Sequence, residues 1–243
     1  MGVSLARVLS KLGYCSRAQA LQLIDAGKVK INGQVVRNQA RRISIDFDRL
    51  EVDNKPVNKE ASCYLVLNKP RGLITTTHDE QERETVYKCL EQTSLPRLIP
   101  VGRLDKASEG LLLFTNDTAW ANRITAPASH LDKVYHVQIK GVPDTRLLQK
   151  MSRGIETASA EALNVKRVHI IRSGRSTGWL EVVLDEGKNR HIRRILEKLD
   201  IPVLRLVRIA IGPLRLGNLA RGKFRFLRAE ELTALQNEMS GKN

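Results

Sequence analysis

The stretch KVYHVQIKG, residues 133–141, alternates apolar and polar side chains and has the clearest strand pattern in the chain. Tyr135, Val137 and Ile139 fall on one face, which predicts a strand with one side buried. Similar short runs occur at 64–68, 73–76, 179–185, 203–211 and 224–227. Helical patterns lie between them, at 85–91, 118–125, 144–152, 189–199 and 229–238. Few helices among many short strands predict an α+β domain built on mixed, mainly antiparallel β-sheet with flanking helices.

The first sixty residues have a different pattern. One apolar series at residues 5–12 and another at 20–24 follow helical spacing, and Ser16 is placed to cap the second helix. After Gly27, two short strand-like runs are joined by Asn32-Gly33, a pair that accepts positive φ at both positions. The pattern predicts a small domain of two helices followed by a hairpin.

The two patterns are separated by a polar segment, residues 54–62, which contains one proline. Such a composition is typical of a linker. We therefore expect a small domain at residues 1–53, a linker at 54–62 and a larger domain at 63–243.

The charge of the chain points to a polyanionic partner. Its 41 Lys and Arg residues against 26 Asp and Glu residues give a net charge of +15. Residues 161–228 contribute +10 of this charge and residues 1–60 contribute +5. Basic charge concentrated in two segments is typical of a nucleic-acid-binding protein.

Several classes of protein are disfavoured by what the sequence lacks. The three cysteines show neither Cys-x-x-Cys spacing nor a histidine at zinc-finger distance, so we expect reduced thiols and no metal. We find no glycine-rich phosphate loop and expect no cofactor. No apolar run approaches the roughly 18 residues of a membrane span, and there is no signal-peptide pattern. We expect a cytoplasmic protein that does not enter the membrane.

The segment VGRLDKASEGLLLFTND, residues 101–117, places a single carboxylate, Asp105, between Arg103 and Lys106 and upstream of an apolar block. On capping preference alone, an aspartate at the start of a possible helix is expected to be an N-cap. A catalytic role for Asp105 therefore depends on the rest of the chain.

A second unusual segment is EGKNRHIRR, residues 186–194. Its cations crowd the first turns of the predicted helix, where each opposes the helix dipole at a cost of roughly 0.3–1 kcal/mol. This favours a nearby anion, either a phosphate or a carboxylate. Neutralisation by Glu181, Asp185 and Glu186 accounts for part of the cluster.

Four segments occur in this order along the chain: NKPRG at 68–72, GRLD at 102–105, KVY at 133–135 and EGKNRHIRR at 186–194. Together they resemble the motifs of the RsuA/RluB/RluE/RluF family of pseudouridine synthases, with the RluB type nearest. Residues 4–53 resemble the S4 RNA-binding domain. Together the two resemblances span about residues 4–232, nearly the whole chain.

The resemblance implies a role for each site residue. Asp105 would be the nucleophile or base that starts glycosidic cleavage, and attack on the sugar, attack on the ring and a glycal route all remain open. Arg193 would hold Asp105 ionised, and Tyr135 would stack on the uracil and help to remove a proton. Arg103 would fill the space left by the extruded base. His191 stands where the family commonly has Gln or Glu, which leaves its role open.

The resemblance also implies ribosomal RNA or a ribosomal-subunit precursor as partner. We expect 23S rRNA, with 16S rRNA as the alternative, and a monomeric enzyme. The candidate RNA contacts of the small domain are Arg7, Lys11, Arg17, Lys28, Lys30, Arg41 and Arg42. Those of the larger domain, besides Arg103, are Arg190, His191 and Arg194.

Two other functions compete with the synthase. A non-catalytic S4-domain RNA-binding protein or ribosome-assembly factor needs the small domain but not Asp105. An RNA hydrolase that uses Asp105 and His191 would cleave the strand or release uracil, whereas an isomerase leaves the mass of the RNA unchanged.

Overall fold

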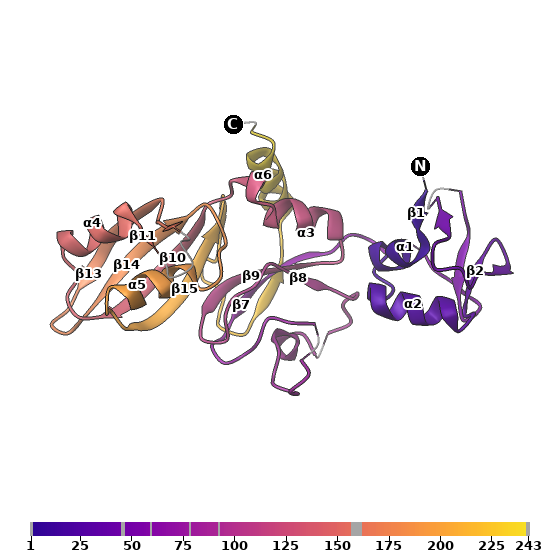
Figure 1. Ribbon diagram of the computed structural model, residues 1–243, viewed down its shortest axis with the longest axis horizontal. Helices are drawn as coiled ribbons and strands as arrows, with labels where there is room; N and C mark the ends of the chain where they lie inside the picture. Colours follow the sequence, from indigo (N-terminus) through magenta and orange to yellow (C-terminus); the bar gives the residue numbers. More distant parts are fainter. Residues whose placement is uncertain are drawn as a thin grey trace. The chain divides into compact units, whose positions relative to one another are not determined.

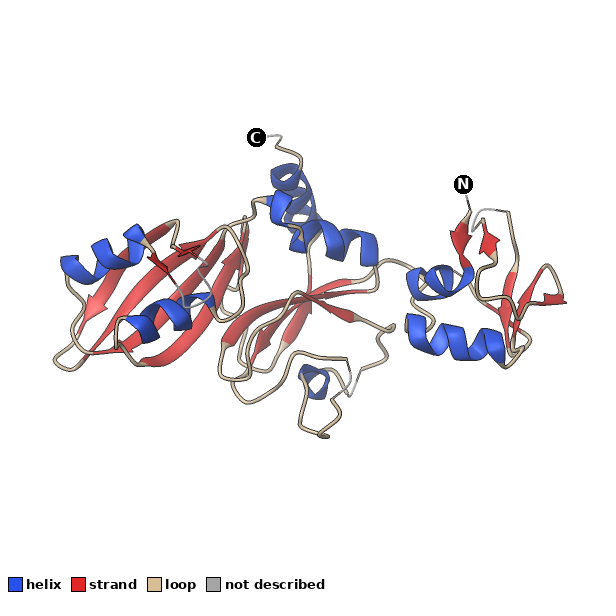
Figure 2. Cartoon of the chain, viewed as in Figure 1, coloured by secondary structure: helices blue, strands red, loops and turns tan. Residues whose placement is uncertain are grey.

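The computed structural model describes residues 2–44, 47–58, 60–77, 79–91, 93–156 and 162–241. Figures 1 and 2 show its helices and strands. The chain forms two compact units, each with its own buried core. The first unit comprises Met1–Tyr64, Ser94–Ile99 and Thr115–Thr118. The second comprises Leu65–Thr93, Pro100–Phe114 and Ala119–Asn243.

The first unit contains the predicted helix pair and hairpin. The helices are α1 (Leu5–Lys11) and α2 (Arg17–Asp25). The Ser16 side chain accepts from the Gln19 backbone N–H at 3.2 Å, and the Gln19 side chain accepts from the Ser16 N–H at 3.0 Å. This capping box confirms Ser16 as the cap of α2. The hairpin turn has φ of 50° at Asn32 and 81° at Gly33, as its sequence predicts.

A four-stranded sheet in the order β3-β2-β5-β6 completes this unit. Its strands are β2 (Val29–Ile31), β3 (Gln34–Val35), β5 (Leu50–Val52) and β6 (Lys55–Pro56), and a separate pair joins β1 (Val3–Ser4) to β4 (Arg42–Ile43). Asp53 and Asn54 have positive φ and turn the chain so that β6 pairs with β5. The segment predicted as a linker, 54–62, therefore begins with a strand of the sheet.

The second unit is built on a long sheet with the order β13-β14-β10-β15-β9-β7-β17. These strands are β13 (Arg167–Ser173), β14 (Thr177–Leu184), β10 (Lys133–Lys140), β15 (Val203–Ile211), β9 (Glu109–Thr115), β7 (Tyr64–Lys69) and β17 (Phe224–Phe226). Beside them, β8 (Ile99–Val101) pairs with β9, β16 (Leu214–Arg215) with β15, and β11 (Ile155–Glu156) with β12 (Ala162–Leu163). The pairs from β13 to β15 are antiparallel, and the predicted α+β class is confirmed.

One parallel pair, β9 with β15, joins the two halves of the sheet. Gly110 has a φ of +102° here, and a Cβ at this position would lie 2.2 Å from the carbonyl oxygen of Arg208. Only glycine allows this approach without a shift of the backbone. The Glu-Gly pair at the start of β9 thus has a structural reason.

Two helices cover one face of β14, β10 and β15: α4 (Thr145–Arg153) and α5 (His191–Lys198). Their apolar side chains form one core with Val137 and Ile139 of β10, and Tyr135 packs against it. The face predicted from the 133–141 alternation is confirmed. The other helices are α3 (Thr118–Thr125), α6 (Ala229–Met239) and the short 3₁₀ turns η1 (Val86–Cys89) and η2 (Pro127–Ser129).

Several predicted elements differ from the structure. The 73–76 strand is reduced to a single bridge between Ile74 and Thr85, and the 85–91 helix is the 3₁₀ turn η1. The 189–199 helix begins at His191, because Arg190 adopts a left-handed φ of 49°. Strand β9 was not predicted, since all its residues are buried and it lacks alternation. None of the helices in the described part of the chain is long and apolar enough to cross a membrane.

Candidate active site

Asp105 lies in a loop between β8 and β9 rather than at the start of a helix. The loop backbone is held by Lys69, the last residue of β7, whose side chain is completely buried. Its Nζ donates to the carbonyl oxygens of Asp105 at 3.2 Å, Ser108 at 2.9 Å and Pro70 at 3.0 Å. Burial lowers the pKa of Lys69 to about 8, although the Asp105 carboxylate opposes this shift.

Two further side chains bind the same loop. Thr75 Oγ1 donates to the Leu104 carbonyl at 2.8 Å and accepts from the Leu104 N–H at 3.3 Å. Arg193, on α5, donates from Nη2 to the Ala107 carbonyl at 3.1 Å. The loop is therefore held from β7, from the segment after it and from α5, which fixes where the Asp105 side chain begins.

The Asp105 carboxylate itself is held loosely. Its Oδ2 lies 3.8 Å from Arg193 Nε, and the Asp105 side chain is 32% exposed while that of Arg193 is 13% exposed. Arg193 Nε is buried and has no hydrogen-bond partner among the described residues. Burial lowers the pKa of Arg193, and the Asp105 charge opposes the shift. The pair stabilises a carboxylate whose oxygens still have lone pairs free to react.

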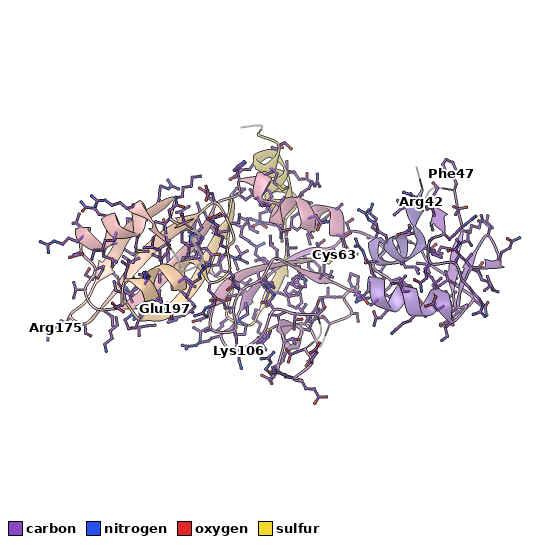
Figure 3. The ribbon with its side chains drawn as sticks, viewed as in Figure 1. Arg42, Phe47, Cys63, Lys106, Arg175 and Glu197 are labelled. Atoms are coloured by element: carbon purple, nitrogen blue, oxygen red, sulfur yellow. The ribbon has the colours of Figure 1, made fainter. Side chains whose placement is uncertain are left out.

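A cavity of about 470 Å³ opens beside Asp105. Among the described residues that line it, Asp105 is the sole carboxylate. Six of the lining residues are cations: Arg103, Lys106, Lys133, Lys188, Arg190 and Arg208. Lys106, labelled in Figure 3, follows Asp105 in the loop and is exposed. A cationic cavity with one carboxylate is suited to an anionic substrate on which a single acid acts.

The structure brings several predicted residues together at this cavity. Asp105, Tyr135, Arg103, Arg190 and His191 line it. Tyr135 reaches it from β10, and the two segments that carry Asp105 and Tyr135 are about thirty residues apart in sequence. The three residues predicted to be catalytic therefore lie in one region of the second unit, since Arg193 contacts Asp105 directly.

The basic cluster at 186–194 is arranged differently from its prediction. Lys188 and Arg190 precede α5, so they do not stack on its first turn. Lys188 pairs with Glu186 at 2.8 Å, and His191, only 3% exposed, has its Nδ1 3.7 Å from the same carboxylate. Neutralisation by Glu186 thus accounts for part of the cluster. Arg194 is half-buried on α5, and Glu197, labelled in Figure 3, lies on the exposed face of that helix.

The other predicted RNA contacts lie in the first unit. Arg7, Lys11, Arg17, Lys28, Arg41 and Arg42 are exposed and Lys30 is half-buried. Lys28 forms an exposed ion pair with Asp53 at 3.6 Å. Arg42, labelled in Figure 3 beside Phe47, donates to the Gly2 carbonyl at 2.7 Å.

Four residues of the site had no predicted role of their own: Lys69 and Lys133, which lie in the NKPRG and KVY motifs, and Thr75 and Arg208, which lie outside the motifs. The signal for Lys69 is a lysine at the end of the apolar run YLVLN, where only a buried partner makes a charge tolerable. For Thr75 and Arg208 the sequence offers no comparable signal, because their contacts with Leu104 and Leu111 join segments that are distant in sequence.

Comparisons with known proteins agree with this geometry. Residues 63–198 match the RNA pseudouridylate synthase family and residues 3–47 match the S4 domain. A relative from Aquifex aeolicus (strain VF5), named an uncharacterized RNA pseudouridine synthase, is 39% identical; the match covers 97% of this chain and 94% of that protein. Ribosomal large subunit pseudouridine synthase B from Bacillus subtilis (strain 168) is 34% identical, with 96% and 95% covered.

Among solved structures, the crystal structure of a pseudouridylate synthase is similar over 96% of this chain and 99% of that one. Its TM-score is 0.69 and its sequence is 26% identical. The matched region includes the loop of Asp105, the strand of Tyr135 and the helix of Arg193. The chain belongs to the RNA pseudouridylate synthase family and carries an S4 domain at its N-terminus.

Proposed function

We propose that this RNA pseudouridine synthase modifies ribosomal RNA, that its target lies in the large-subunit (23S) rRNA, and that Asp105 is the reacting carboxylate. The observation that carries the catalytic part is the position of Asp105 as the sole carboxylate among the described residues of a cationic cavity. The choice of substrate is supported by the name of the Bacillus subtilis relative, a ribosomal large subunit pseudouridine synthase. With this substrate the enzyme works in the cytoplasm.

The reaction breaks the bond between ribose and the base nitrogen, turns the uracil and rejoins it through carbon. Asp105 begins this step, as a nucleophile or as a base, and Arg193 stabilises its negative charge from 3.8 Å. Tyr135, which lines the same cavity, stacks on the uracil and assists proton removal after the new bond forms. Lys69 and Thr75 hold the loop in place by its backbone.

The target uridine reaches Asp105 only after leaving its stack, at a cost of a few kcal/mol. The cavity volume of about 470 Å³ is within the range of roughly 300–1,000 Å³ that small-molecule sites have. Arg103, exposed and two residues before Asp105, takes the space of the extruded base. Phosphate contacts from Arg190 and Arg194 hold the RNA near the cavity, whereas His191, only 3% exposed, is too buried for the predicted RNA contact.

The N-terminal domain, residues 1–53, adds binding that does not depend on the target base. Its exposed cations, among them Arg7, Arg17 and Lys28, contact phosphates and position the RNA. The catalytic domain, residues 63–243, then needs to recognise only the neighbourhood of the target uridine. A monomer carries both parts.

The test is treatment of 23S rRNA and, separately, 16S rRNA with purified enzyme, followed by mass measurement and mapping of pseudouridine. The expected result is one modified uridine in 23S rRNA with the mass of the RNA unchanged. Modification of 16S rRNA alone would overturn the choice of substrate. A loss of mass would indicate a hydrolase, and RNA that binds without any modification would indicate an assembly factor.

A further inference from the structure

Two strands of the cavity wall bring a lysine and an arginine together beside Tyr135. Lys133 and Tyr135 are two residues apart on β10 and therefore share a face. On β15, Tyr135 pairs with Arg208, whereas the preceding residue of β10 pairs with Ala210, so Ile209 is the extra residue of a β-bulge. The bulge turns Arg208 onto the face of Tyr135, and all three side chains line the cavity.

The Arg208 guanidinium is only partly satisfied by the protein. Arg208 is 6% exposed, and its Nε donates to the Leu111 carbonyl at 2.8 Å. Its Nη2 is buried and has no hydrogen-bond partner among the described residues. Because arginine keeps its charge when buried, an unsatisfied N–H of this kind is costly. The bond to Leu111 of β9 gives Arg208 Nε a structural role, but it gives none to Nη2.

Lys133 adds a second positive charge to the same wall. Burial lowers the pKa of Lys133, and the nearby Arg208 lowers it further. Its Nζ donates to the Asp185 carbonyl at 3.0 Å. Three carboxylates oppose this shift: Asp132 is paired with Lys166 at 2.7 Å, Glu186 is paired with Lys188 at 2.8 Å, and Asp185 is exposed to solvent. Two like charges side by side in a partly dehydrated wall favour a bound anion.

We propose that Lys133 and Arg208 form a subsite that binds a backbone phosphate of the extruded nucleotide. This inference rests on the proposed function and deepens it. Each nucleotide that enters the cavity brings its phosphate with it, and a phosphate supplies the negative charge that a neutral uracil lacks. Arginine and lysine together match its oxygens, the guanidinium as a fork and the ammonium as a point charge.

The experiment measures binding in the Asp105→Asn protein, so that turnover does not interfere. The probes are RNA oligonucleotides of the target region in which the linkage 5′ or 3′ of the target uridine is either a phosphate or a neutral methylphosphonate. At one of these linkages the neutral group is expected to weaken binding roughly tenfold to hundredfold, the effect of one charged hydrogen-bonded contact.

Adding Lys133→Met or Arg208→Met should weaken binding of the phosphate RNA and reduce the discrimination between the two RNAs to less than about twofold. Equal discrimination with and without these substitutions, at both linkages, would overturn the subsite. Arg208→Met also removes the bond to Leu111, so its folding is checked by thermal unfolding. Lys133→Met breaks only the contact with the Asp185 carbonyl and serves as the primary variant.

Lys140→Met is the matched control, because Lys140 is exposed at the other end of the same strand. It should keep the full discrimination between the two RNAs. The failure of the subsite and the failure of the proposed function are distinguishable. If the substitutions reduce the discrimination but the native enzyme forms no pseudouridine, the reaction is refuted and the subsite is not. If the native enzyme forms pseudouridine but the substitutions leave the discrimination between the two RNAs unchanged, only the subsite is refuted.

Discussion

Asp105 and Glu109 lie four residues apart, and the protein treats the two carboxylates in opposite ways. Glu109, with a side chain 5% exposed, accepts two hydrogen bonds from Arg205 at 2.9 and 3.0 Å and pairs with Arg221 at 3.1 Å. Asp105 is 32% exposed and has one cation at 3.8 Å. A fully paired carboxylate stabilises the structure, whereas a loosely paired one beside a cavity remains able to react.

The contacts around the two carboxylates differ in the same way. Around Asp105 the protein binds the backbone of the loop and leaves the side chain open. Around Glu109 it binds the side chain itself, at the start of β9 where the parallel pairing with β15 begins. Rigid support with an open functional group is the arrangement that catalysis requires.

After the loss of Asp105 itself, the largest effect is expected at Arg193, the cation paired with Asp105. Arg193→Met should lower kcat by about 100- to 1,000-fold, because it removes the charge that stabilises Asp105 during the reaction. The measurement is single-turnover pseudouridine formation on rRNA. Lys198→Met, at the exposed end of the same helix, is the control and should keep the native rate. A native rate in Arg193→Met would show that catalysis does not need the positive charge of Arg193.

Loss of the Glu109 pairing with Arg205 and Arg221 should instead lower the stability of the fold. Glu109→Gln should lower the free energy of unfolding by about 2 kcal/mol, less than the roughly 3–5 kcal/mol of a fully buried pair, because both arginines are partly exposed. The rate per folded molecule should stay native. Denaturant unfolding and the kinetic assay on the same samples check both expectations. A large loss of kcat with native stability would reverse the roles of the two carboxylates.

The same variant should change the dependence of stability on pH. Burial alone raises the pKa of Glu109, but hydrogen bonds from Arg205 and the nearby arginines outweigh it, so the net pKa is lowered. Its contribution to stability is therefore present above the ordinary pKa of glutamate and is lost as pH falls through the lowered value. Unfolding curves between pH 3 and 7 should show this loss in the native protein and a smaller loss in Glu109→Gln.

A smaller effect is expected at Lys69, whose ammonium holds the loop. Since its pKa is about 8, activity should fall about tenfold as pH rises through 8 and the bonds to the loop carbonyls weaken. For stability the sign is opposite. The folded protein binds this proton more weakly than the unfolded chain, so the penalty for burying the ammonium is full below pH 8 and disappears toward 10.5.

The Lys69→Arg variant tests whether Lys69 is the group whose titration lowers activity near pH 8, because its guanidinium stays charged throughout this range. Its pH–rate profile should be flat between pH 7 and 9.5, even where its maximal rate is lower than native. An unchanged fall near pH 8 in this variant would assign the titration to another group.

The smallest single effects are expected at exposed cations of the N-terminal domain. Arg17→Met should raise KM about two- to threefold and reduce the slope of log affinity against log salt by about 1. For about six phosphate contacts in a duplex-like site, the native slope should be near −5. Arg146→Met, at an exposed position outside both basic segments, is the control. A flat salt dependence of the native protein would exclude the basic segments as the docking surface.

The sequence predicted those parts of the fold that depend on local pattern. The Ser16 cap of α2, the Asn32-Gly33 turn, and α3 and β15 with their bounds follow from residues that are neighbours in sequence. The predictions failed where tertiary contacts decide. Strand β9 has an uninterrupted apolar run with no alternation, and the left-handed backbone of Arg190 delays the start of α5 to His191.

For the site the same limit holds. Motifs indicated Asp105, Tyr135 and Arg193, and the structure brings them to one region. No pattern indicated that Arg208 lies beside Tyr135, because a β-bulge between distant strands creates that pairing. Nor could the sequence distinguish Asp105 from Glu109 by charge, since only the packing of Arg205 and Arg221 makes one of them structural.

The most direct measurement compares Asp105→Asn with Glu109→Gln on the same rRNA. Pseudouridine is mapped after incubation with equal amounts of folded protein. Asp105→Asn should form no detectable pseudouridine while binding the RNA with native affinity, and Glu109→Gln should modify the native position at the native rate. Pseudouridine formed at that position by Asp105→Asn at the native rate would contradict the assignment of Asp105 as the reacting group.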